Sequence, residues 1–140
     1  MITNQILLNT IEGLKGISRV DFCIFDTEEK VLASTFEDSQ MFEGSVRSFV
    51  ESQAESQVIQ GYQFFKIFDE QQLEYILLVE GDSENSYMIG KMAAFQIQNL
   101  LVAYKERFDK DNFIKNLLLD NLLLVDILQS RQKNYILTQK

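Results

Sequence analysis

The stretch that most constrains how this chain can fold is Leu117–Leu128, LLLDNLLLVDIL, in which nine of the twelve residues are apolar. If this run is helical, its apolar residues spread over most of the helix surface, and one sheet cannot cover them all. Such a helix is buried on several sides or lies in an interface between molecules. Because enough sequence for one domain comes before it, the run favours an intermolecular helix bundle, and packing back on the chain's own sheet is the alternative.

A second apolar pattern leads into this run. Between positions 97 and 108 the apolar residues step by four, three and four, which is the spacing of a coiled-coil contact, although it lasts barely two heptads. Together the two patterns predict a homodimer held by helices. The predicted interface residues are Ile97, Leu101, Tyr104, Phe108, Phe113, Leu117, Leu118, Leu122 and Val125.

The sequence before position 86 switches between the periodicities of helices and strands. Apolar residues three and four positions apart indicate helices, and alternating residues indicate strands. Polar turns at 26–30 and 70–72 join the strands into two hairpins. The predicted order is helix 4–15, strands 19–26 and 31–36, helix 41–54, a possible short strand at 58–59, strands 61–69 and 73–80, and helical sequence from 86 to 129.

Two antiparallel hairpins separated by a helix, followed by a long exit helix or helix pair, predict an α+β fold. The polar residues 109–112 are either a short break in the exit helix or a solvated turn of it. The order resembles that of PAS, GAF and profilin-like domains, in which helices flank an antiparallel sheet. By analogy, that resemblance implies ligand binding, dimerisation and signalling through helices. We expect a sensor domain over 1–108 and a signalling and dimerisation helix over 109–140.

The composition excludes several kinds of chemistry. The chain has no His and one Cys, Cys23, so it lacks the residues of a Ser-His-Asp or Cys-His triad, a CxxC redox pair and the common zinc sites. An enzyme would need a mechanism built on carboxylates alone, and no spacing in the sequence supports one. We therefore expect no enzyme activity, no catalytic residue, no cofactor and no metal.

The charge balance bears on partners and location. There are 13 Lys and Arg against 21 Asp and Glu, so the net charge is 13 − 21 = −8, which argues against nucleic-acid binding by this segment and against anionic membranes. The longest apolar runs have five residues (75–79 and 100–104), far short of the ~20 that span a bilayer. The first residues lack the features of a signal peptide, and the sparse cysteine fits a reducing compartment, so we expect a cytoplasmic protein.

A carboxylate-bearing ligand would need a basic partner inside the α/β body. The candidates there are Arg19, Arg47, Lys66 and Lys91. Lys66 is the strongest hint because alternation places it on the same strand face as Tyr62 and Phe64, and Tyr75 on the next strand is expected opposite Tyr62. The predicted ligand site is therefore Tyr62, Phe64, Lys66 and Tyr75. A solvent-exposed lysine and a pair of core tyrosines are the alternatives.

Three stretches resemble a known family: Phe113–Ile127 (FIKNLLLDNLLLVDI), Gln57–Lys66 (QVIQGYQFFK) and Gly90–Leu100 (GKMAAFQIQNL). They are similar to the N-terminal sensor region and inter-domain helix of PucR/CdaR-type (sugar-diacid regulator-like) transcription factors of Firmicutes. In that family a GGDEF-like domain and a DNA-binding helix-turn-helix domain follow the sensor. The resemblance implies a ligand-sensing and dimerisation module that signals to a DNA-binding domain outside this sequence. A dimerisation scaffold without a ligand is the alternative.

Overall fold

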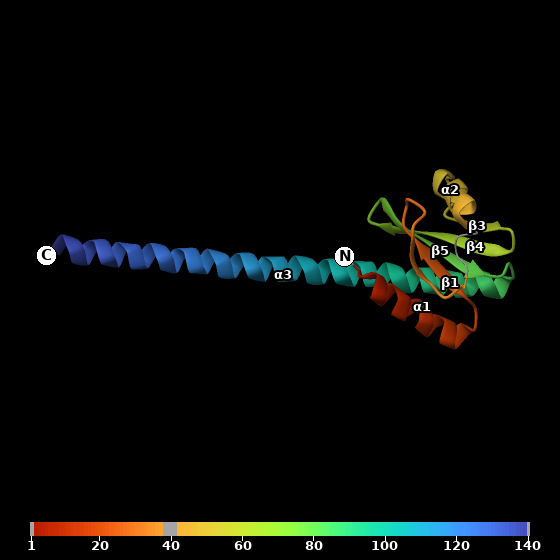
Figure 1. Ribbon diagram of the computed structural model, residues 1–140, viewed down its shortest axis with the longest axis horizontal. Helices are drawn as coiled ribbons and strands as arrows, with labels where there is room; N and C mark the ends of the chain where they lie inside the picture. The colour runs from red at the N-terminus through yellow and green to blue at the C-terminus, as the bar shows by residue number, and fades with distance from the viewer. Residues whose placement is uncertain (1, 38–41, 140) are drawn as a thin grey trace. The chain divides into compact units, whose positions relative to one another are not determined.

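The computed structural model describes residues 2–37 and 42–139, and it describes side chains as far as residue 123, except that of Glu43. Five antiparallel strands form one sheet in the order β2-β1-β5-β4-β3 (Figure 1). With its flanking helices and long C-terminal helix, this arrangement confirms the predicted α+β class. The elements are α1 (Asn4–Ser18), β1 (Phe22–Phe25), β2 (Val31–Ser34), α2 (Glu43–Glu51), β3 (Ser56–Ile59), β4 (Tyr62–Asp69), β5 (Gln72–Glu80) and α3 (Glu84–Gln139).

The element ends differ from the predicted ones for local reasons. Helix α1 continues past its predicted end at position 15 and stops at Arg19, a left-handed residue (φ 62°) whose N–H donates to the carbonyl of Lys15. Strand β1 therefore begins later than the predicted position 19. Helix α2 ends before the predicted position 54 because Ser52 is extended and its N–H donates to the carbonyl of Phe49.

The exit helix is one continuous helix and not a helix pair. Residues 109–112 are helical, so the polar stretch is a solvated turn. Between Lys91 and Lys140 the sequence has neither proline nor glycine, the residues that most often break a helix. Asp and Asn favour turns over helix interiors, but the sequence on both sides of residues 109–112 is helical and the helix continues through them.

Two apolar layers cover the sheet. Helices α1 and α3 lie on one face and α2 lies on the other (Figure 1). The first layer includes Phe65 and Ile67 of β4, and the second includes Phe64. Alternation along β4 therefore sends neighbouring side chains to opposite layers, as expected for a strand that is covered on both faces.

Helix α3 approaches the sheet closely at Gly90. A Cβ atom added there would lie 2.2 Å from Cε2 of Phe65 and 3.1 Å from Cγ2 of Val79. Both of those side chains are buried, so neither has open space to move into. The missing side chain of Gly90 is what allows α3 to pack directly on β4 and β5.

The chain divides into two compact units, residues 1–104 and residues 105–140, where the sequence predicted 1–108 and 109–140. The first unit holds the sheet, α1, α2 and the first part of α3; the second is the remainder of α3. Within the described part of the chain, no helix has a stretch apolar enough to cross a membrane.

Candidate functional site

Within the first unit, α3 carries apolar side chains on two opposite sides. On the inner side, Ala93 and Ile97 are fully buried in the layer shared with α1. On the outer side, large apolar side chains at helical spacing are exposed, with 68% of Met92 and 67% of Phe95 accessible to solvent. This outer stripe consists of Met88, Met92, Phe95 and Val102. Large apolar side chains grouped on one exposed helix side often mark an interaction site, so the outer stripe is a candidate interaction surface.

The burial of the inner side of α3 contradicts part of the predicted dimer interface. Ile97 and Leu101 are buried in the chain's own core, and Tyr104 packs half-buried against it. Ile97 and Leu101 are therefore not available to a partner, and their assignment to the interface was wrong. The sequence could not separate the two cases, because a helix on a sheet and a helix in a coiled coil both repeat apolar residues every three or four positions.

The other predicted interface residues lie on an exposed part of α3. Every side chain from Lys105 to Leu123, here called the exposed apolar segment, is exposed to solvent. Val125 lies outside the described side chains. The large apolar residues of the segment are at least 43% accessible: Phe108, Phe113, Ile114, Leu117, Leu118, Leu119, Leu122 and Leu123.

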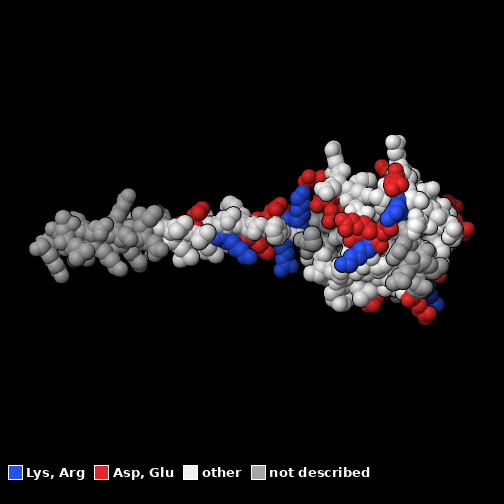
Figure 2. Space-filling model, turned by 45° about the horizontal axis from the view of Figure 1, so that its top comes forward, with Lys and Arg blue, Asp and Glu red and all other residues white. Residues whose placement is uncertain are grey.

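The exposed apolar segment also differs in charge from the rest of the chain. It contains four basic and four acidic residues, so its net charge is zero in a chain of net charge −8. Figure 2 shows red and blue groups mixed among white ones on this segment, whereas acidic groups gather on the visible face of the sheet-containing unit. Mixed signs on an apolar helix allow two copies of the segment to approach without net repulsion.

The structure separates the four predicted ligand-binding residues. Phe64 is fully buried and Tyr62 packs beside it in the layer of α2, where the Tyr62 ring lies 4.7 Å from the ring of Phe42. Tyr75 belongs to the opposite layer, where burial raises its pKa to about 12. Its strand partner is Ile67, whereas Tyr62 pairs with Glu80. The expectation that the two tyrosines face each other was therefore wrong, and the four residues form no common site.

Lys66 lies on the predicted strand face, and its ammonium group is engaged within the protein. Nζ donates a hydrogen bond to the carbonyl of Ser52, the residue that caps the C-terminus of α2. The same atom lies 5.0 Å from the centre of the Phe49 ring, within the range of a cation–π contact. Burial lowers the pKa of Lys66. Lys66 is thus neither a solvent-exposed lysine nor an unpartnered charge awaiting a ligand.

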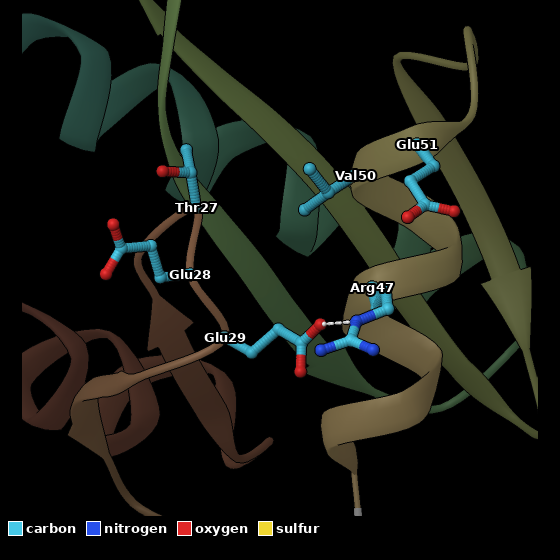
Figure 3. Close-up of a pocket in the computed structure, with 6 residues that line it drawn as sticks. All are labelled: Thr27, Glu28, Glu29, Arg47, Val50 and Glu51. Atoms are coloured by element: carbon cyan, nitrogen blue, oxygen red, sulfur yellow. Dashed lines mark hydrogen bonds and ion pairs between the residues drawn. The ribbon is translucent and has the colours of Figure 1, made fainter.

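An acidic cleft of about 300 Å³ lies between the β1–β2 turn and α2 (Figure 3). Glu29 and Arg47 point toward one another, with Oε1 2.6 Å from Nε. Glu28 and Glu51 also line the cleft, so it holds three carboxylates and one guanidinium, which already has a partner in Glu29. An anionic ligand would be repelled there, and Arg47 is best explained as a surface ion pair.

A second cleft, of about 250 Å³, lies where β4 extends beyond β3. The pairing of β3 with β4 begins at Ser56 and Phe65, so the later residues of β4 have no partner in β3. Helix α3 forms the opposite wall. The lining residues are Glu55, Ser56, Phe65, Lys66, Phe68, Tyr87, Lys91 and Ala94. The cleft thus brings together two of the four predicted basic candidates, Lys66 and Lys91, and sequence reasoning missed this because they come from separate elements.

Other kinds of site lack support among the described residues. Burial raises the pKa of the Cys23 thiol to about 12, so this thiol is not a nucleophile at neutral pH. The described part of the chain contains no group of three or more His, Cys, Asp or Glu side chains placed to hold a metal ion. Comparison with models of known protein families and with curated proteins finds no match for this chain.

Proposed function

We propose that this chain is a sensory and dimerisation module of a transcriptional regulator, and that two copies associate through α3. The observation that carries the proposal is the exposed apolar segment. Its eight large apolar side chains, from Phe108 to Leu123, lie on one helix and are at least 43% accessible in the single chain. Covering them would contribute on the order of 10 kcal/mol per helix, which is comparable to the roughly 4–15 kcal/mol cost of association.

A second copy of the chain is the partner that the charges favour. A chain of net charge −8 repels itself in general, but the exposed apolar segment has net charge zero. Lys110 and Asp111 illustrate how neighbouring positions alternate in sign, so each copy offers partners for the charges of the other. The outer stripe from Met88 to Val102 adds apolar surface with few charges around it.

The regulatory part of the proposal depends on the family resemblance and on the packing of α3. Because Ala93 and Ile97 of α3 pack directly against the sheet, a ligand that moved the helix would also act on the residues that follow. A cytoplasmic regulator that senses a carboxylate-bearing metabolite is the function that the resemblance implies. A dimerisation scaffold without a ligand is the alternative, and the burial of Phe64 and Tyr75 in the core favours it.

Light scattering on the purified chain across a range of concentrations tests the dimer. We expect the mass of two chains for the native sequence, and the mass of one chain for the double variant Leu117→Glu/Leu118→Glu. The matched control is Asn112→Glu/Asn116→Glu, which adds the same charge at exposed polar positions of the same helix and should remain dimeric. A native chain that is monomeric, or a leucine variant that associates as well as the control, would refute the proposal.

A further inference from the structure

We propose that two copies of the chain pack parallel and in register along the outer side of α3, so that Asn99 of one copy faces Asn99 of the other. The inference rests on the proposed dimer and deepens it, because it says which side of α3 forms a contact and in which direction the two helices run. It depends on the spacing of the exposed residues, on the one polar residue among them and on the lack of charge around them.

The exposed residues on the outer side of α3 have the spacing of a coiled-coil contact. The steps between them are four, three, four and three residues, so they occupy positions d, a, d, a and d of a heptad. All five are exposed in the single chain, and the opposite side of the helix, with Ala93 and Ile97, is buried in the chain's own core. This set, here called the heptad seam, consists of Met88, Met92, Phe95, Asn99 and Val102.

The polar residue of the heptad seam favours a parallel pair. Asn99 occupies an a position, where an asparagine lowers the stability of a coiled coil but specifies its register. In a parallel pair each a residue faces its own copy, and the two Asn99 amides can bond to each other because each has donors and an acceptor. In an antiparallel pair an a residue faces a d residue, and all three d residues of the heptad seam are apolar.

The charges around the heptad seam favour a second copy as its partner. Between positions 86 and 104 the only charged residue is Lys91, at a g position, and the e position that it meets across a parallel pair is the neutral Gln96. A surface that recognises a charged partner would carry charges of the opposite sign. The next two positions of the pattern are Glu106 and Asp109, which would each face their own copy, so the heptad seam ends before them.

Disulfide cross-linking of the full chain tests the direction and the register. We expect Met92→Cys and Val102→Cys each to form a covalent dimer under mild oxidation, because a parallel pair in register brings each cysteine opposite its own copy. The matched control is Ala103→Cys, an exposed neighbour at an e position, which should cross-link at least tenfold more slowly. The native Cys23 is buried, so it should form no cross-link under the same conditions.

A second variant tests the role of Asn99. Asn99→Asp would set two carboxylates against each other and should weaken dimerisation at least tenfold, measured by light scattering across a range of concentrations. The control is Asn9→Asp, which adds the same charge at an exposed position of α1 and should leave dimerisation unchanged.

Three results would overturn the inference: a dimer that cross-links at neither or only one of Met92→Cys and Val102→Cys, an equally fast reaction of Ala103→Cys, or unchanged dimerisation of Asn99→Asp. Light scattering separates these from a failure of the proposed function. A native dimer that gives any of them refutes the heptad seam alone, and a native monomer refutes the dimer and the seam together. A Leu117→Glu/Leu118→Glu variant that still forms the cross-linked dimer would refute the role of the exposed apolar segment and leave the heptad seam supported.

Discussion

The close approach of α3 to the sheet predicts that Gly90→Ala is destabilising, although alanine favours a helix more than glycine does. In an open helix interior this substitution stabilises by about 1 kcal/mol. At Gly90 the new Cβ would lie 2.2 Å from Cε2 of Phe65, whereas carbon atoms in contact prefer about 3.5–4.0 Å. Phe65 is only 3% exposed and its ring packs on Tyr87, so the ring cannot move aside without displacing the helix.

Overpacking of this kind typically costs about 1–3 kcal/mol. Because the displacement needed here exceeds an ångström and involves two buried partners, Phe65 and Val79, we expect the upper part of that range. After the gain in helix propensity is subtracted, the free energy of unfolding should fall by about 2 kcal/mol. Urea unfolding followed by circular dichroism, at one fixed protein concentration, measures this as a lower midpoint with an unchanged slope.

The control is Gly13→Ala, the same substitution in the interior of α1. A Cβ added at Gly13 meets nothing within 4 Å, so only the helix propensity changes there. We expect Gly13→Ala to raise the free energy of unfolding by up to about 1 kcal/mol, opposite in sign to Gly90→Ala. If Gly90→Ala were as stable as Gly13→Ala, α3 would not pack on Phe65 as described.

Three further predictions concern stability and reactivity. Ile97→Ala should lower the free energy of unfolding by about 2–5 kcal/mol, whereas Phe95→Ala on the exposed outer stripe should change it far less in the monomer. Comparable losses in urea unfolding would contradict the placement of Ile97 in the core and of Phe95 on the surface. Burial raises the pKa of Asp21, but hydrogen bonds from Lys15 and Thr35 outweigh it and hold that pKa below 3.8. A carboxyl group whose pKa is lower in the folded protein than in the unfolded chain stabilises the fold at pH values above the unfolded pKa, and this stabilisation is lost as the pH falls through the folded pKa. Asp21→Asn should therefore make the free energy of unfolding fall less steeply in acid. An unchanged acid profile would argue against the pairing of Asp21 with Lys15. Cys23 should resist a thiol reagent at pH 8 in the native protein and react on unfolding in urea, and rapid labelling of the native protein would show that the thiol is not buried.

The sequence predicted the elements well wherever the pattern is local. Alternation along β4 correctly placed Tyr62 and Phe64 on the same strand face, and the exit helix was expected from its periodicity. The pairing of Tyr75 was missed because register depends on the whole hairpin, and a shift of one residue reverses the face of every side chain. The continuity of α3 through residues 109–112 was left open, because polar residues are found both in solvated helices and in breaks.

The sequence by itself determined that α3 is apolar on more than one side, that residues 105–123 carry no net charge and that the chain has no His and a single Cys. Only the tertiary structure decided which side of α3 meets the sheet. Ile97 and Phe95 both belong to series of apolar residues spaced three or four positions apart, so spacing does not tell the buried side from the exposed one. Gly90 lets the helix approach Phe65 on the side that carries Ile97 alone. The same approach brings Lys91 to the cleft that Lys66 lines, because contacts between distant parts of a chain are set by packing and not by local spacing.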